Sequence, residues 1–170
     1  MNGRSKQIDR IDKRILDALS RDGRMTKVRM SEVVGLSATR CWERVRKMEK
    51  AGIIRGYHAD IDLRSFAGLT LYQAHVRLAN STSNKAQMFE RHVKDMDFVL
   101  SCHATLGSFD YEVLVAARDT VQFNAVMDQI LRESGVDFEF TTSSIYKTVK
   151  PMHSSSVVSL AMADDGGSDS

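Results

Sequence analysis

The feature that most constrains this chain is the order of its hydrophobic periodicities, which changes once along the sequence. The first sixty residues place apolar side chains three and four positions apart, a spacing typical of helices. Residues 69–150 alternate strand-like and helix-like segments in the order strand, helix, strand, strand, helix, strand. This order predicts a ferredoxin-like βαββαβ sandwich with an antiparallel sheet and both helices on one face. The predicted fold class is therefore α+β, with an all-α domain ahead of the sandwich.

Three helices are expected before residue 55, each opened by a capping side chain and closed near a glycine. The caps are Asp9, Thr26 and Ser37, and the glycines are Gly23, Gly35 and Gly52. The third helix, from Ser37 to about Lys50, places Cys41, Val45 and Met48 on one stripe opposite a strongly basic side. Two helices joined by the tight turn 34–37, behind a supporting first helix, predict a (winged) helix-turn-helix.

These patterns divide the chain into four parts. Residues 1–55 are predicted to form the helix-turn-helix domain, and 56–68 a hinge strand or linker, with a short strand expected within 53–62. Residues 69–151 are predicted to form the ferredoxin-like domain, whose second sheet face, if apolar, would favour a dimer. Residues 152–170 are rich in Ser, Asp and Gly and are expected to be a disordered tail.

Charge is distributed unevenly between the two predicted domains. Residues 1–60 hold 15 Lys and Arg against 8 Asp and Glu, whereas residues 61–170 hold 9 against 14. This asymmetry suggests a basic module that binds a polyanion, joined to an acidic module. Apolar residues make up 42% and charged residues 27% of the chain, which excludes collagen-like, wholly disordered and membrane proteins.

The sequence predicts neither export nor a metal or cofactor. Its longest apolar runs are far shorter than the ~20 residues that span a bilayer, and its N-terminus lacks the apolar core of a signal peptide. Cys41 and Cys102 are expected to be reduced, buried thiols of a cytoplasmic protein. The five histidines show no metal-ligand spacing, and no catalytic constellation is evident, so an enzyme is not expected.

The basic side of the third helix is the first candidate site, because cations contact phosphates and forked Arg donors match guanine edges. The residues placed early in the helix, where base edges are read, are Ser37, Thr39, Arg40 and Glu43. The residues assigned to phosphates are Arg44, Arg46 and Lys47. The alternative interpretation is a solvated charged face without a partner. Trp42 flanks the apolar stripe and is assigned to the core.

Several segments carry a family resemblance. They are residues 8–16, 22–24, 34–37 and 41–54, the turn Gly107-Ser108-Phe109-Asp110-Tyr111, and Val149-Lys150. Over residues 8 to about 150, the chain resembles the Lrp/AsnC, or feast/famine, transcriptional regulators. The resemblance implies a regulator that binds double-stranded DNA, carries a C-terminal effector-binding and oligomerisation domain, and is not an enzyme. It also implies a cytoplasmic, nucleoid-associated homodimer that assembles into larger even-numbered oligomers.

The turn at 107–110 is the second candidate site. Gly107 can adopt a positive φ and expose backbone N–H groups to a carboxylate, while Asp110 suits an ammonium group. On pattern alone an ordinary hairpin turn fits better, but the resemblance implies an amino-acid effector held at contacts between dimers. The candidate effector-binding residues are Gly107, Ser108, Phe109 and Asp110, with Thr141 and Thr142 on the last strand.

The sequence departs from the family pattern near both candidate sites. Ala38 and Arg40 stand where the family usually has prolines, so a different operator is expected. Leu106 stands where Thr or Ser is common, which removes a hydroxyl near the effector turn. Two alternatives stay open: an effector-independent architectural DNA-binding protein, and, less favoured, an enzyme with a basic targeting domain.

Overall fold

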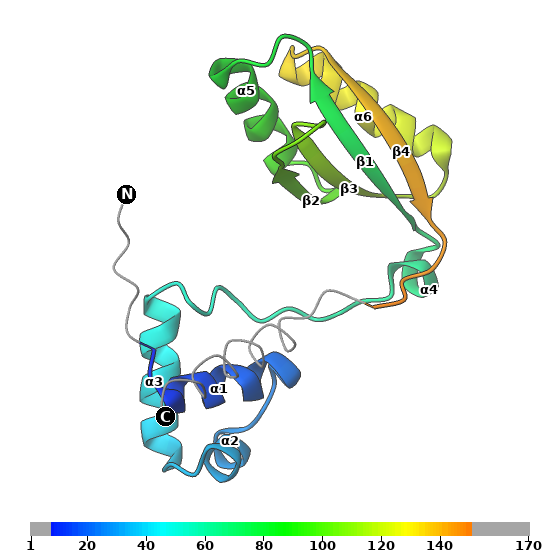
Figure 1. The fold of residues 1–170 in the computed structure, drawn as a ribbon. Coiled ribbons are helices and arrows are strands. Elements are labelled where there is room, and N and C mark those ends of the chain that lie inside the picture. The colour runs from blue at the N-terminus through cyan, green and yellow to red at the C-terminus, as the bar shows by residue number, and fades with distance from the viewer. Residues whose placement is uncertain (1–7, 151–170) are drawn as a thin grey trace, which may run out of the picture. The chain divides into compact units, whose positions relative to one another are not determined.

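The computed structural model describes residues 8–150, and these fall into two compact units (Figure 1). The first unit holds residues 8–60 together with Lys150, and the second holds residues 61–149. Residues 1–7 and the predicted tail, 152–170, lie outside the described residues, as does Pro151. In the described part, no helix is both long and apolar enough to cross a bilayer.

The first unit contains three helices in the predicted places. They are α1 (Arg10–Arg21), α2 (Lys27–Val34) and α3 (Ala38–Lys50). All three predicted N-caps are confirmed: each cap side chain accepts a hydrogen bond from a backbone N–H in the first turn of its helix. Gly35 has a φ of 73°, a left-handed conformation that glycine adopts at little cost, and it turns the chain from α2 into α3.

The three helices enclose a small core to which each contributes. Its buried members are Ile15 from α1, Met30 and Val34 from α2, and Cys41, Val45 and Met48 from α3. The predicted packing stripe of α3 is therefore confirmed. Because this stripe faces inward, the opposite side of α3 faces solvent.

The strand predicted within 53–62 is wrong, and of the two alternatives given for 56–68, a hinge strand or a linker, the hinge strand is wrong. Described residues 51–62 contain no strand, and a short helix, α4 (Leu63–Ala67), follows them. The backbone N–H groups of Ile53 and Ile54 both donate to Met48 O, which closes the end of α3 instead of starting a ladder. Asp62 then caps α4 by accepting from the N–H groups of Arg64 and Ser65. Local capping contacts override the β-propensity of Ile53 and Ile54.

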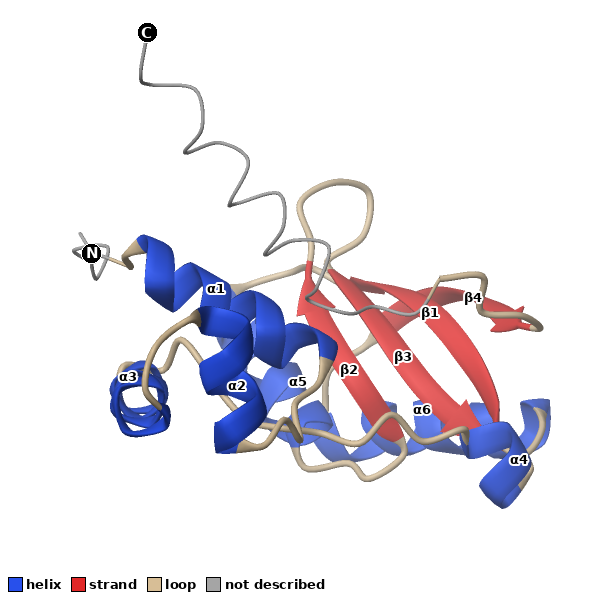
Figure 2. Cartoon of the chain, turned by 90° about the horizontal axis from the view of Figure 1, so that it is seen from below, coloured by secondary structure: helices blue, strands red, loops and turns tan. Residues whose placement is uncertain are grey.

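The second unit has the predicted ferredoxin-like order. Its elements after α4 are β1 (Thr70–Leu78), α5 (Ser83–Lys94), β2 (Val99–Ala104), β3 (Tyr111–Ala117), α6 (Thr120–Ser134) and β4 (Phe138–Ile145). The strands pair antiparallel in the order β2-β3-β1-β4. Figure 2 shows α5 and α6 on the same side of this sheet. Period-two spacing predicts that Tyr72, Ala74, Val76 and Leu78 share one face of β1, and all four are buried in the core of this unit.

The sheet face away from the helices is mixed in character, not apolar as expected. Successive strand residues point to opposite faces, so this face of β1 carries Leu71, Gln73, His75 and Arg77. Its cross-strand neighbours include Glu112 and Thr141 beside His75, and Leu114 beside Gln73. Apolar and polar side chains are thus mixed on this face.

The sequence pattern predicts a last strand over residues 138–149 and a capping box of Asp119 and Gln122, and the structure differs on both. The last strand, β4, ends at Ile145, four residues earlier. At the start of α6, Asp119 accepts from the backbone N–H of Gln122, as a capping box requires. The Gln122 side chain accepts from the N–H of Arg118 instead of from that of Asp119. The second hydrogen bond of the capping box is therefore made to the residue before the N-cap.

Candidate functional site

The outward side of α3 presents most of the predicted DNA-binding residues. Ser37, Thr39, Arg40, Glu43, Arg46 and Lys47 are all exposed. The Ser37 side chain also caps the helix by accepting from the backbone N–H of Arg40. Within the described part of the chain, Arg40, Arg46 and Lys47 form no ion pair with an acidic side chain. Their charges therefore face solvent, which suits contact with a polyanion.

Arg44 is placed differently from the other basic residues of α3. Its Nη1 donates to Asp9 Oδ2 at 2.6 Å and to Asp12 Oδ1 at 2.8 Å, and only 33% of its side chain is exposed. These hydrogen bonds, to Asp12 first and then Asp9, raise the pKa of Arg44. The pKa of Asp9 is lowered, chiefly by the backbone N–H of Asp12 and further by Arg44. The guanidinium therefore joins α3 to the start of α1.

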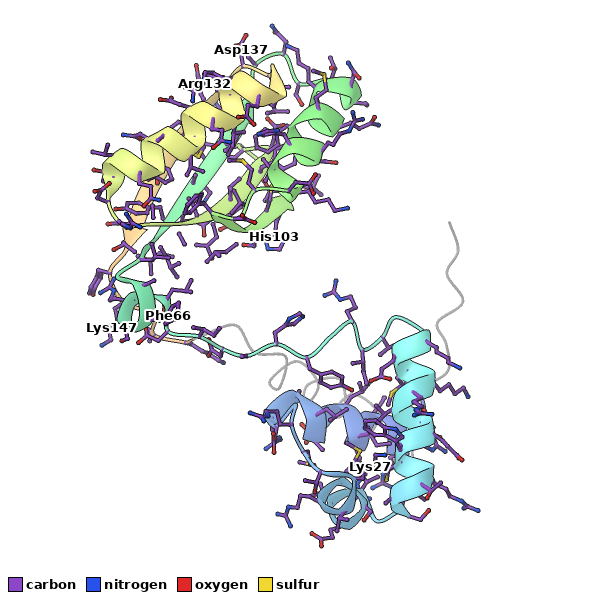
Figure 3. All side chains as sticks on the ribbon, turned by 180° about the vertical axis from the view of Figure 1, so that it is seen from behind. Lys27, Phe66, His103, Arg132, Asp137 and Lys147 are labelled. Atoms are coloured by element: carbon purple, nitrogen blue, oxygen red, sulfur yellow. The ribbon has the colours of Figure 1, made fainter. Side chains whose placement is uncertain are left out.

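Lys27 and Trp42 form a contact that sequence reasoning missed. The Nζ of Lys27, a residue labelled in Figure 3, lies 4.7 Å from the centre of the Trp42 ring. That ring packs against the helical core as predicted. The indole N–H is buried and has no hydrogen-bond partner among the described residues. A lysine in the first turn of a helix opposes the helix dipole. That unfavourable position is the sequence signal that could have marked Lys27 as a residue with another partner.

The predicted effector residues of the β2–β3 connection do lie in one turn. Thr105 closes it, donating from its backbone N–H to Asp110 O and from its hydroxyl to Phe109 O. Gly107 has a φ of 145°, a conformation that side chains rarely adopt. Gly107 and Ser108 are exposed, whereas Phe109 and Asp110 are half-buried. The turn therefore offers exposed backbone groups at its tip.

The Asp110 carboxylate already has a structural contact. Its Oδ2 accepts from the backbone N–H of Leu78 at 2.8 Å, and the Asp110 N–H donates to Val76 O at 2.9 Å. Both contacts tie the turn to the end of β1. The predicted contact with an ammonium group would have to share this carboxylate.

Arg77 is a second residue that sequence reasoning missed. Its Nε and Nη2 donate to Ser108 O at 2.9 and 2.6 Å, and its guanidinium lies 5.3 Å from the Phe109 ring centre. The Phe109 ring also lies 5.3 Å from the ring of His75. Period-two alternation places Arg77 and His75 on the open sheet face, but the fold of the turn back onto that face is not visible in the sequence.

The two predicted threonines of β4 do not share a face of the sheet. Thr141 pairs with His75 and thus lies on the open face, the side on which the Phe109 ring contacts His75. Thr142 pairs with Ala74 on the helix-covered side, and its hydroxyl donates to Gln73 O. Within one chain, therefore, the structure brings Thr141 to the same face as the turn but not Thr142.

The cysteines and histidines offer no second chemistry among the described residues. Cys41 and Cys102 are free thiols; Cys41 is buried, while Cys102 is half-buried instead of fully buried as expected. Burial, with Glu90 nearby, raises the pKa of Cys102 to about 11, which keeps this thiol protonated and unreactive. Across the described part of the chain no group of three His, Cys, Asp or Glu side chains is arranged to hold a metal ion.

Comparisons with known proteins match both units. Residues 8–55 match the family described as winged helix-turn-helix DNA-binding, and residues 73–154 match the Lrp/AsnC ligand binding domain. The transcriptional regulatory protein DoeX of Halomonas elongata is 36% identical over 157 residues, which cover 91% of this chain and 99% of DoeX. The leucine-responsive regulatory protein of Salmonella typhimurium is 33% identical over 133 residues, covering 78% of this chain and 81% of that protein.

A solved structure of a transcriptional regulator is also similar to this chain. A transcriptional regulator of Neisseria meningitidis, crystallised as a complex with L-Met, has a TM-score of 0.76 and 31% sequence identity to this chain. The match covers 85% of this chain and 94% of that one. DoeX and the Neisseria protein are named as transcriptional regulators, the Salmonella protein is named as a regulatory protein, and none of the three is named as an enzyme.

Proposed function

The chain belongs to the Lrp/AsnC family of transcriptional regulators, and from this premise we propose that it is a sequence-specific DNA-binding protein controlled by an amino acid. That it is a transcription regulator with a DNA-binding and a ligand-binding domain follows from the family. The proposal adds the mode of DNA recognition, the class of effector and the assembly.

The observation that carries the DNA-binding proposal is the exposed basic side of α3 opposite its packing stripe. Arg40 lies near the start of α3, where side chains of a recognition helix reach base edges. Arg46 and Lys47 lie further along and supply charge for phosphates. In a dimer, two such helices would enter the major groove about one helical turn apart.

The effector proposal rests on the turn at 105–110. Exposed backbone groups at Gly107 suit a carboxylate, and the Asp110 carboxylate suits an ammonium group, so together they match a free amino acid. Two relatives point to the same class: one is named leucine-responsive, and another was solved with L-Met. Such a ligand changes assembly or DNA affinity only if it binds one state better than another.

The first test is a thermal-shift screen of the full chain against the twenty amino acids. A ligand present at 100 times its dissociation constant stabilises the folded state by about 2.7 kcal/mol, which gives a clear rise in Tm. A rise with one amino acid or one chemical class is expected. A uniform absence of any rise would reject the amino-acid effector without touching the DNA-binding proposal.

Two observations favour a second candidate, an architectural DNA-binding protein without an effector. Leu106 is fully exposed beside the turn where a hydroxyl would assist a polar ligand, and Asp110 Oδ2 is engaged by Leu78. This candidate predicts weak sequence preference along with no response to any amino acid. Selection of bound duplexes from a random-sequence DNA library separates the two. A recovered consensus sequence supports the regulator, and the absence of a consensus sequence supports the architectural protein.

A further inference from the structure

We propose that Arg44 is a positioning residue for the recognition helix: with Asp9 and Asp12 it forms a clamp that fixes α3 on the start of α1, and it does not neutralise a DNA phosphate. We call these three residues the Arg44 clamp. The inference rests on the proposed DNA-binding function of α3. It replaces the phosphate contact that the sequence alone suggests for Arg44.

The clamp joins two elements that are distant in sequence. One guanidinium nitrogen of Arg44 contacts a carboxylate oxygen of Asp9 at 2.6 Å and one of Asp12 at 2.8 Å. Asp12 has only 14% of its side chain exposed, so this pair is partly shielded from solvent. Hydrogen bonds between charged groups are shorter and stronger than neutral ones, and they are directional.

Both carboxylates are themselves held in place by the first turn of α1. Asp9 Oδ1 accepts from the backbone N–H of Asp12, and Asp12 Oδ2 accepts from the N–H of Asp9. Each carboxylate therefore uses one oxygen for the helix cap and the other for Arg44. The clamp attaches α3 to a rigid helix terminus and not to a flexible side chain.

The charge of the clamp argues against a phosphate partner. Two carboxylates face one guanidinium, so the three side chains together carry a net negative charge. A phosphate approaching Arg44 would meet that negative charge at close range. Arg46 and Lys47 lie exposed on the same helix and form no ion pair in the described part of the chain. They are the better phosphate ligands.

The clamp also fixes the rotation of α3 about its own axis, which the apolar core contacts do not fix. The packing stripe of α3 consists of Cys41, Val45 and Met48, and apolar contacts of this kind are not directional. Arg40 lies one turn before Arg44, so the two are neighbours on the helix surface. Holding Arg44 therefore holds the rotation of α3 about its axis and, with it, the direction of Arg40.

The two roles of Arg44 predict effects of opposite sign when the carboxylates are neutralised. If Arg44 contacts a phosphate, the double variant Asp9→Asn/Asp12→Asn frees its charge and strengthens DNA binding. If Arg44 positions α3, the same variant weakens binding to the preferred DNA. Asparagine caps helices as well as aspartate does, so α1 keeps its start in this variant.

The experiment measures binding of the full chain to two labelled duplexes across 50–200 mM salt. One duplex is selected from a random-sequence library by the wild-type protein, and the other is its scrambled form. Loss of one phosphate contact makes the negative slope of log K against log salt shallower by about 0.9. Arg44→Gln is the test variant, and Arg46→Gln is the matched control on the same helix.

The clamp predicts that Arg44→Gln and the double asparagine variant both lose preference for the selected duplex while keeping the wild-type salt slope. Arg46→Gln should make the slope shallower by about 0.9 and keep the preference. Arg44→Lys, which keeps the positive charge on a shorter side chain with one donor nitrogen, should recover part of the preference. Circular dichroism during urea unfolding confirms that each variant is folded.

Two results would overturn the inference: tighter binding by the double asparagine variant, or a reduced salt slope in Arg44→Gln equal to that of Arg46→Gln. Failure of the underlying function looks different. In that case the wild-type protein would not distinguish the selected from the scrambled duplex, and Arg46→Gln would leave the slope unchanged.

Discussion

At the scale of single residues, Arg40 is the side chain of α3 whose removal should change which DNA bases the protein prefers. It is exposed near the start of the helix and forms no ion pair in the described part of the chain. Arg40→Ala should relax specificity at one base position by about 1–3 kcal/mol. Competition among duplexes with single base changes measures this. An unchanged ratio between the selected and scrambled duplexes would reject the assignment.

Asp110 requires a pair of variants because its carboxylate has two possible tasks. Asp110→Ala removes both the acceptor for the Leu78 N–H and the charge for an ammonium group. Asp110→Asn keeps an acceptor and removes only the charge. Both variants should lose the rise in Tm caused by the amino acid found in the screen, and only Asp110→Ala should have a lower Tm without ligand. A rise retained in Asp110→Asn would exclude the charge from ligand binding.

Tyr57 makes the stability of the first unit depend on pH. Burial first, and then the hydrogen bond from its hydroxyl to Glu49 at 3.0 Å, raises the pKa of Tyr57 from 10.0 to about 12. A raised folded-state pKa means that this stabilisation is complete below about pH 10 and is lost as the pH rises toward 12.

The variant Tyr57→Phe isolates this effect, because Tyr111, paired with Glu90, also has a raised pKa and acts in the same direction in the second unit. Urea unfolding between pH 9 and 12 should show a smaller loss of stability in Tyr57→Phe than in the wild type. Equal losses would show that the Tyr57 hydroxyl does not titrate in the folded state as inferred.

Residues whose role is local were predictable, and residues whose partner is distant were not. The caps Asp9, Thr26 and Ser37 each bind backbone groups within their own first turn, so their neighbours in sequence identify them. Arg44 has the same charge and a similar helix position to Arg46. Only the packing of α3 against α1 shows that it has a carboxylate partner.

At the scale of elements, the turn between α2 and α3 depends on Gly35. Its φ of 73° is unfavourable for any residue with a Cβ, although no atom lies within 4 Å of the position that a Cβ would take. Gly35→Ala should therefore lower the free energy of unfolding by about 1–2 kcal/mol through backbone strain alone.

Gly23→Ala is the matched control for that prediction. Gly23 does not have a positive φ, and its Cβ would lie 3.5 Å from Tyr57 Cδ1, an ordinary contact. Urea unfolding of the two variants should show the larger loss in Gly35→Ala. Equal losses would mean that the turn relaxes into a different conformation.

Elements stabilised within their own segment were predicted well, and elements that need a partner were not. Helical spacing and caps located α1, α2 and α3 within a residue or two. The apolar pair Ile53 and Ile54 suggested a strand, but a strand forms only beside another strand, and here both N–H groups close α3. The placement of Thr141 and Thr142 on opposite sheet faces likewise requires the β1–β4 register.

At the scale of the whole molecule, the family resemblance predicts association, and Leu114 tests whether the mixed open sheet face takes part in it. Leu114 lies on that face opposite Gln73, between polar neighbours, whereas Val121 lies exposed on α6 away from the sheet. Light scattering of the full chain at micromolar concentration should show a dimer or a larger even-numbered assembly. Leu114→Glu should shift it toward the monomer, because the new carboxylate would be buried without a partner.

Val121→Glu is the control and should leave the assembly unchanged. A single monomer peak for the wild type would reject association through this face. Equal effects of the two glutamates would place the contact elsewhere.

The order of elements in the second unit identified the ferredoxin-like sandwich, because few topologies accommodate that order. The function was harder to predict from the sequence than the fold. The basic side of α3 suggested DNA from charge alone, but the effector turn looked like an ordinary hairpin until the family resemblance gave it a role. Arg77, which holds that turn through Ser108, could not be found without the fold.

The contact between Lys27 and Trp42 has a practical consequence. Trp42 is the one tryptophan of the chain, so the protein's indole fluorescence reports from a single point on the recognition helix. The ammonium group of Lys27 lies 4.7 Å from that ring, and a nearby charge changes the emission of an indole. A DNA backbone that draws Lys27 away would therefore alter the colour or intensity of the emitted light. The protein carries its own optical reporter, and binding can be followed without a dye.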